Sequence, residues 1–177
     1  PQGDTVYVTE NAPFVRAIDA ETGETRWVIQ MPEGGQALQP AITPDGRGLI
    51  VPEGSDNPGV VRMDAATGEV VWATRDLGRV APGASRWVGD GGLRADGRYV
   101  VTTESHVLTL DPDTGAILDA TAWPEPMPYS EVFRVWPDGR VSREDPERAA
   151  TGILFDPSHA ERGATEIDGI PLSVSPD

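Results

Sequence analysis

The chain has 177 residues and a mass of 18.9 kDa, and its 29 acidic residues against 14 basic ones give a formal net charge of −15. A chain this acidic repels phosphate backbones and anionic lipid surfaces, so we expect neither nucleic acid nor a membrane surface as a partner. The absence of cysteine excludes disulfides, thiolate nucleophiles and thiolate metal ligands. The length suits one domain over residues 1–177, and no apolar stretch reaches the roughly 20 residues that would predict membrane insertion.

An internal repeat begins just after the first predicted strand, Thr5 to Thr9. Residues 17–27 read AIDAETGETRW, and residues 62–72 read RMDAATGEVVW, which aligns without a gap. A third copy, TLDPDTGA at 109–116, keeps the Asp and the Thr-Gly pair but has Asp119 where the Trp should stand. The fourth copy keeps little beyond its Asp. The four anchoring aspartates, separated by 45, 47 and 45 residues, are Asp19, Asp64, Asp111 and Asp156. This period is typical of four-stranded propeller blades.

A second series of turns interleaves with the repeat. Asp-Gly pairs occur at 45–46, 96–97 and 138–139, between short apolar runs. Asp-Gly in this setting indicates a hairpin, because glycine accepts the positive φ of tight β-turns. The segments around these turns are rich in β-branched and aromatic residues and predict strands. After the first strand, they are Gly48 to Val51, Val60 to Met63, Val70 to Ala73, Arg98 to Thr102 and Val107 to Leu110.

Each unit therefore reads strand A, Asp-Gly turn, strand B, loop, strand C, Asp-x-x-Thr-Gly turn, strand D. We expect an all-β fold, a β-propeller of four-stranded antiparallel blades with about four blades in this chain. The chain opens in a strand B, and a strand A at Pro171 to Ser175 could complete the first blade. Two arrangements stay open: a closed four-bladed ring, and part of a larger ring of seven or eight blades, which we favour slightly.

The first copy meets every position of the pattern AxDxxTGxxxW. This pattern resembles the tryptophan-docking repeat of the pyrroloquinoline-quinone-type (quinoprotein-like) β-propeller family. The resemblance implies that Trp27 and Trp72 pack flat between neighbouring blades. It also implies that the Asp and Thr-Gly positions close the hairpin between strands C and D. The residues in these closing positions are Asp19, Gly23, Asp64, Gly68, Asp111 and Gly115.

The family divides into enzymes that hold a quinone and calcium, and non-enzymatic members that dock other proteins. The enzymes often stack the quinone against two adjacent cysteines, which this chain lacks. The repeat itself does not separate the two groups.

Two patterns invite a metal-binding interpretation. Asp111-x-Asp113-x-Gly115 resembles the opening of a calcium loop, but its twelfth position is Ala122 where a calcium loop has glutamate. We therefore expect a plain turn whose carboxylates accept backbone N–H groups. His106 and His159 are the only histidines and lie far apart in the sequence, so we expect neither of them to bind a metal.

Ligands of a propeller bind at the face that is formed by the loops from strand D to the next strand A and from strand B to strand C. Arginine and tyrosine supply much contact energy per residue. The candidate ligand-binding residues on this loop face are Arg79, Arg86, Tyr129, Glu53 and Glu104.

The sequence favours a non-catalytic binding or scaffold module that docks a protein or a small molecule, with no cofactor. One alternative is part of a quinone-dependent dehydrogenase or another propeller enzyme, which would bring pyrroloquinoline quinone and calcium. Another is a structural repeat of a cell-surface protein. Open blade edges could lead to self-association. We expect a periplasmic or extracellular location, with any export signal ahead of Pro1.

Overall fold

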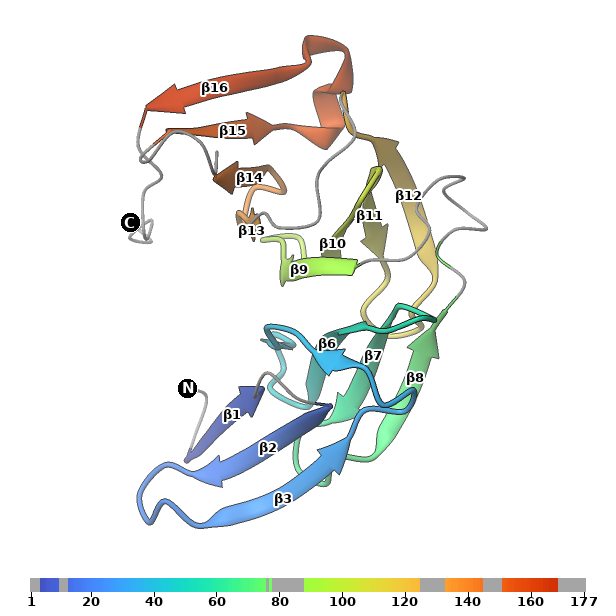
Figure 1. Ribbon diagram of the computed structural model, residues 1–177. Helices are drawn as coiled ribbons and strands as arrows, with labels where there is room; N and C mark the ends of the chain where they lie inside the picture. The colour runs from blue at the N-terminus through green and yellow to red at the C-terminus, as the bar shows by residue number, and fades with distance from the viewer. Residues whose placement is uncertain are drawn as a thin grey trace.

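The computed structural model describes residues 4–9, 13–75, 77, 88–124, 133–144 and 151–168. They form four antiparallel sheets that follow one another along an open arc (Figure 1). The expected all-β propeller architecture is confirmed. The arc leaves the first and fourth sheets at its two ends. Within the described part of the chain, no helix is long and apolar enough to cross a bilayer.

The sheets carry the strands in simple chain order. The first sheet contains β1 (Thr5–Thr9), β2 (Phe14–Asp19) and β3 (Thr25–Gln30). The second contains β4 (Gln36–Ala37), β5 (Ala41–Ile42), β6 (Gly48–Gly54), β7 (Gly59–Asp64) and β8 (Val70–Thr74). The third contains β9 (Val88–Leu93), β10 (Tyr99–Thr103), β11 (His106–Leu110) and β12 (Ile117–Ala122). The fourth contains β13 (Phe133–Val135), β14 (Val141–Glu144), β15 (Thr151–Phe155) and β16 (Ala164–Asp168).

Two sheets depart from four plain strands. The first has three described strands, in the order β1-β2-β3. The predicted strand Pro171 to Ser175, which could complete it, lies outside the described residues. In the second sheet the inner strand is split into β4 and β5, which both pair with β6. Pro40 lies between them and has no N–H to donate to β6, so the ladder is interrupted there.

The core lies between the sheets, because each middle strand alternates its side chains between two neighbouring blades. In β6, Leu49 and Val51 pack toward the first sheet, while Ile50 packs toward the third. In β10, Val101 packs toward the second sheet and Val100 toward the fourth. This explains why the apolar runs lack polar positions: both faces are buried.

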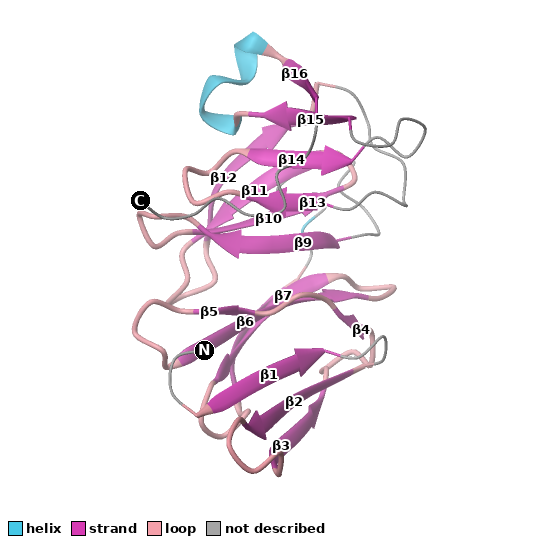
Figure 2. Ribbon diagram, turned by 90° about the vertical axis from the view of Figure 1, so that its left-hand side faces the viewer, coloured by secondary structure: helices cyan, strands magenta, loops and turns pink. Residues whose placement is uncertain are grey.

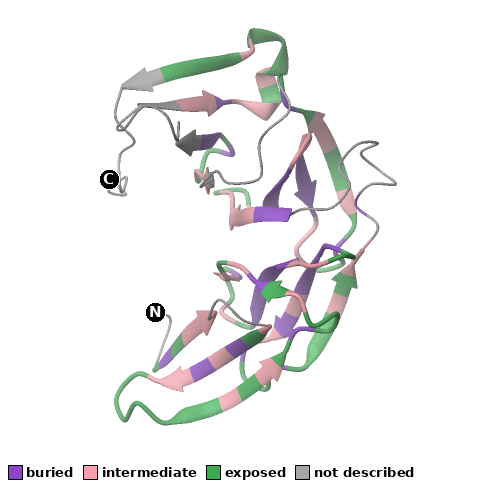
Figure 3. Cartoon of the chain, viewed as in Figure 1, coloured by how far each residue is buried: buried purple, intermediate pink, exposed green. Residues whose placement is uncertain are grey.

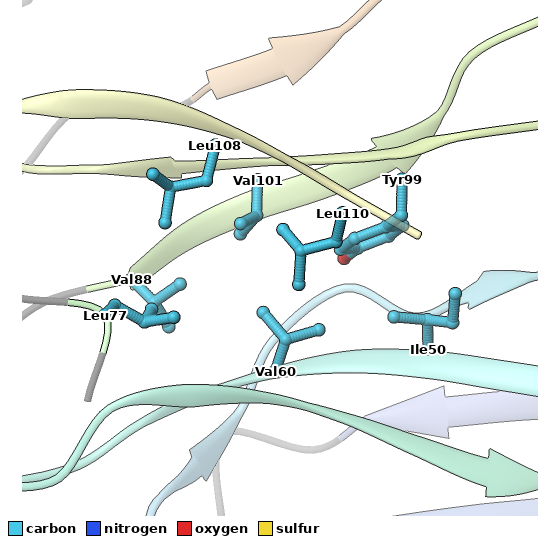
Figure 4. Close-up of a cluster of buried hydrophobic side chains, with 8 residues drawn as sticks. All are labelled: Ile50, Val60, Leu77, Val88, Tyr99, Val101, Leu108 and Leu110. Carbon is cyan, nitrogen blue, oxygen red and sulfur yellow. The ribbon is translucent and has the colours of Figure 1, made fainter. Parts of the chain in front are cut away.

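Three clusters fill the three junctions, and the one between the second and third sheets is drawn in Figure 4. Figure 3 shows the buried residues gathered on the inner and middle strands, with exposed residues along the outer strands β3, β8 and β12. The inner strands β9 and β13 also lie against each other across the third junction.

The fourth repeat differs from the expected turn. Instead of Asp-x-x-Thr-Gly, the 3₁₀ helix η1 (Pro157–Arg162) joins β15 to β16. Asp156 caps it, its carboxylate accepting the N–H of Ser158 at 3.0 Å. Pro157 fits the first helical position because its missing N–H would have no partner there. The anchoring Asp therefore keeps a capping role, although the turn around it has changed.

Candidate functional site

The Asp-x-x-Thr-Gly turns share one geometry. The Asp64 carboxylate accepts the backbone N–H groups of Ala66 and Thr67, both at 2.9 Å. The Asp111 carboxylate accepts those of Asp113 and Thr114, also at 2.9 Å. Asp19 repeats the pattern in the first sheet. Each carboxylate therefore satisfies two donors of its own turn.

These bonds favour the charged form of the carboxylates. The N–H of Thr67, followed by that of Ala66, holds the pKa of Asp64 below its usual range. The N–H of Thr114 does the same for the pKa of Asp111. A carboxylate that stays ionised cannot deliver a proton near neutral pH, so these residues are poor general acids.

Each tryptophan of the repeat reaches the next sheet. The indole N–H of Trp27 donates to the carbonyl of Ala65 at 3.2 Å, and that of Trp72 donates to the carbonyl of Pro112 at 3.1 Å. Both acceptors directly follow the anchoring Asp of the neighbouring turn. The hydroxyl of Tyr7 also donates to the Ala65 carbonyl, at 2.8 Å. The first two junctions therefore use the same contact.

The glycine of each turn lies against the docked ring. Gly68 and Gly115 have φ of +76° and +72°, in the left-handed region that favours glycine. A Cβ on Gly68 would lie 3.0 Å from two ring carbons of Trp27, and one on Gly115 would lie 2.7 Å from Trp72. We call this combination of a turn carbonyl and a bare glycine a tryptophan seat.

The third junction has no such contact, because Asp119 stands in the tryptophan position. Here Trp123, just beyond β12, packs on Phe155 of the fourth sheet with ring centroids 5.0 Å apart. Its indole N–H donates to the carbonyl of Thr103 in its own sheet at 3.1 Å. A different tryptophan thus fills this junction, and the repeat pattern gave no signal for it.

An open cleft of about 500 Å³ lies between the second and third sheets, on the side of the molecule that carries the Asp-Gly and Thr-Gly turns. We call this side the turn face and the opposite side the loop face. In Figure 2 the two faces lie on opposite sides of the sheets. The residues lining the cleft are Thr43, Pro44, Asp45, Asp96, Gly97, Arg98, Asp111, Pro112, Asp113 and Leu118.

The carboxylates of this cleft already have partners. The Asp45 carboxylate accepts a hydrogen bond from the Thr43 hydroxyl at 2.6 Å, and this bond lowers the pKa of Asp45. The Asp113 carboxylate forms an ion pair with the Arg62 guanidinium at 2.7 Å. The Asp111 carboxylate accepts backbone N–H groups of its own turn. The calcium-loop pattern is therefore folded as a turn and an ion pair between sheets. Among the described residues, no three His, Asp or Glu side chains are grouped so that they could hold a metal ion.

Of the loop-face candidates, Arg79, Arg86 and Tyr129 lie outside the described residues. Glu104 lies there as expected, in the tight turn between β10 and β11, and is half-buried. Glu53 does not belong to a loop as we expected: it lies within β6 and is 0% exposed. The loop assignment is wrong because strand pairing with β7 continues through Glu53 to Gly59.

Glu53 holds the loop face together from inside. Its carboxylate accepts the N–H of Glu33 at 2.9 Å and that of Gly35 at 3.1 Å, in the connection between the first two sheets. It also forms an ion pair with Arg75 at the end of β8. No pattern in the sequence points to Arg75, because the pair lies outside the repeated turn.

The histidines have local partners. His106 opens β11, as expected, and its Nδ1 lies 2.8 Å from the hydroxyl of Ser105. His159 lies in η1 with its Nδ1 3.0 Å from the carboxylate of Asp156, to which the hydroxyl of Ser158 also donates. That hydroxyl also lies 3.3 Å from the same Nδ1. Because the serine and the aspartate share one ring nitrogen, the imidazole does not stand between them, and this group is a helix cap and not a relay for activating a nucleophile.

Comparison with protein families identifies the repeat. A family profile described as "Outer membrane protein assembly factor BamB" matches residues 2–135. The chain belongs to this PQQ-repeat propeller family. Comparison with curated proteins gave no match.

Solved structures share the fold of this PQQ-repeat chain at low identity. One is the dihydro-heme d1 dehydrogenase NirN in complex with DHE (TM-score 0.66, 19% identity), matched over 98% of this chain and 35% of NirN. A protein of unknown function from Bacteroides caccae (TM-score 0.61, 17% identity) matches over 94% of this chain and 58% of its own. BamB from Moraxella catarrhalis (TM-score 0.57, 19% identity) matches over 89% of this chain and 47% of its own. The chain thus spans between about a third and three fifths of these proteins.

Proposed function

We propose that this chain is a non-catalytic binding module of an extracytoplasmic propeller, which docks a protein on its loop face. The observation that carries this proposal is that the buried and turn-forming polar side chains make structural hydrogen bonds and ion pairs. The turn carboxylates close their own turns, and Glu53 with Arg75 fixes the connection between two sheets. These groups build a rigid scaffold, and a rigid scaffold positions loops for recognition.

The family supports a protein as the docked partner. Its profile carries the name of an outer membrane protein assembly factor, a role that involves contact with other proteins. The net charge of −15 favours a partner with a basic contact surface, because complementary charge speeds association and selects partners. Glu104 in the β10–β11 turn is one of the described carboxylates of the loop face that are available to such a surface; the others include Glu33 and Asp56, which are both exposed.

A crosslinking experiment tests the loop face directly. A photoreactive amino acid replaces Glu104, and a control carries it at Ala95, an exposed residue on the turn face of the same sheet. We expect a discrete adduct from Glu104 that excess unmodified chain competes away, and no such adduct from Ala95. The captured protein, once purified, should bind the unmodified chain and lose at least about tenfold in affinity with Glu104→Arg, but not with Ala95→Arg.

Two results would contradict the proposal. One is crosslinking of equal strength from both faces. The other is dye-linked alcohol oxidation by the chain with added pyrroloquinoline quinone and Ca²⁺, abolished by a single substitution, which would establish a dehydrogenase.

A further inference from the structure

The outer edge of the second sheet differs from the outer edges of the other three. The outer strands of the four sheets are β3, β8, β12 and β16. β3 contains Arg26, β12 contains Asp119 and β16 contains Glu166. β8 reads VVWAT and has neither a charged residue nor a proline. Charges and prolines protect edge strands from pairing with other chains, so β8 lacks a protection that the other three edges have.

The exposed side chains of β8 are apolar. Val70 is 45% exposed, Val71 is 57% exposed, and Ala73 is exposed as well. Val71 stands directly before the tryptophan of its repeat, where the first repeat has Arg26. Figure 3 shows exposed residues along β8 at the rim of the arc. The two outer strands therefore differ in charge at an equivalent place.

The backbone of β8 has hydrogen-bonding groups that face away from its own sheet. The N–H of Asp64, at the end of β7, donates to the carbonyl of Glu69 at 2.8 Å. In an antiparallel ladder every second residue bonds to the same neighbour, so Val61, three residues before Asp64, does not bond to β8. The partner of Val61 is Ala73, whose N–H and C=O therefore point away from β7. Within the described residues, β7 is the strand that pairs with β8, and the other side of β8 is an edge.

A β-bulge at Val71 limits the length of the regular edge. The register shifts there, and residues 72–74 pair in regular order with residues 60–62. The outer strands β3 and β12 have a bulge at the equivalent position, so the bulge does not set β8 apart. It confines strand addition to a short segment centred on Ala73.

The charges around β8 indicate the chemistry of that segment. Glu69, directly before β8, is exposed, and the side chain of Asp113, next to the carbonyl that Trp72 contacts, is 82% exposed. At the other end of β8, Arg75 is already paired with Glu53. A segment with a basic residue beside Glu69 complements these charges, whereas a second copy of this chain brings the same net charge of −15 and is repelled.

We propose that the outer edge of β8 binds an extended segment of a partner protein by strand addition. The segment lies antiparallel to β8, as β7 does, accepts the N–H of Ala73 and donates to its carbonyl. Its apolar side chains cover Val71 and Ala73, and a basic residue at its C-terminal end lies beside Glu69. Main-chain bonds hold an added strand, and its alternate side chains give specificity. This contact lies on the rim of the arc and does not depend on the loop face.

A synthetic peptide tests the edge. The probe is a blocked peptide in which threonine and valine alternate and two lysines end the chain. The control peptide has proline at each valine position, so it lacks the N–H groups of a ladder. Hydrogen exchange followed by NMR reports on the amide of Ala73. We expect saturating probe to slow the exchange of this amide by about tenfold or more, because its N–H gains a partner, and the proline peptide to leave it unchanged.

A matched pair of variants locates the contact. Val71→Arg gives β8 the residue that β3 has at the equivalent position, and it should weaken probe binding by at least about tenfold. Val28→Arg adds the same charge to β3, at a side chain that is 43% exposed, and should leave the binding unchanged. Both positions are exposed, so both variants should fold.

Four results would overturn the proposal. The first is an Ala73 amide that does not respond to the probe at concentrations up to about 1 mM. The second is equal slowing by the proline peptide, and the third is an equal effect of the two arginine variants. The fourth is a protected Ala73 amide in a chain of doubled mass without any peptide, which would assign the edge to a second copy. None of these results depends on crosslinking from Glu104, so the rim and the loop face fail or succeed separately.

Discussion

The contact of Trp72 with the third sheet gives the sharpest stability test. Half-burial of an indole removes on the order of 100 Å² from water, worth about 2.5 kcal/mol at 25 cal/mol per Å². The hydrogen bond to the Pro112 carbonyl adds about 1 kcal/mol. We therefore expect Trp72→Ala to lower the free energy of unfolding by about 3 to 4 kcal/mol. Trp72→Phe keeps most of the ring contact and should cost less.

Urea denaturation followed by circular dichroism measures these changes. The matched control is Val71→Ala, because Val71 is the adjacent residue of β8 and is 57% exposed. Its cost should stay below about 0.5 kcal/mol, as for most surface substitutions. A loss for Trp72→Ala no larger than that for Val71→Ala would refute the docking role.

Three more predictions follow from particular contacts. Gly115→Ala should cost about 1 to 3 kcal/mol more than Gly97→Ala in thermal or urea unfolding, because both have positive φ but only Gly115 lies against an indole. Comparable losses would argue against the seat. The lowered pKa of Asp111 adds stability that is complete above the pKa of the unfolded carboxyl, near 4, and is lost as pH falls through the lower folded value. Asp111→Asn should therefore flatten the fall in stability measured between pH 5 and pH 2, and an unchanged slope would contradict this. Glu53→Gln should cost about 3 to 5 kcal/mol by leaving Arg75 without its buried partner. In a double-mutant cycle with Arg75→Gln, a coupling energy near zero would show that the pair is not responsible.

The repeat predicts the parts of the fold that depend on local chemistry. Asp and Gly at fixed spacing determine the turns, because the carboxylate and the positive φ act within five residues of each other. The predicted strands agree with the structure to within a few residues for the same reason. Local rules also explain the failure at η1, where His159 and Ala160 stand in the Thr-Gly positions and Pro157 begins a helical turn.

Other features depend on contacts between distant residues. Glu53 looked like a loop carboxylate because Gly54 and Pro58 suggest an early strand end, but pairing with β7 and the ion pair with Arg75 keep it buried. Nothing in the spacing of Glu53 and Arg75, which belong to different strands, indicates that they meet.

The sequence by itself determined that this chain forms propeller blades, since its repeats specify the period, the turns and the tryptophan positions. The tertiary structure decided which surfaces those blades cover. Gly23, Gly68 and Gly115 occupy identical places in the pattern, yet two lie beneath an indole and one is open. The physical reason is that burial belongs to a pair of neighbouring blades, whereas a repeat describes each blade alone.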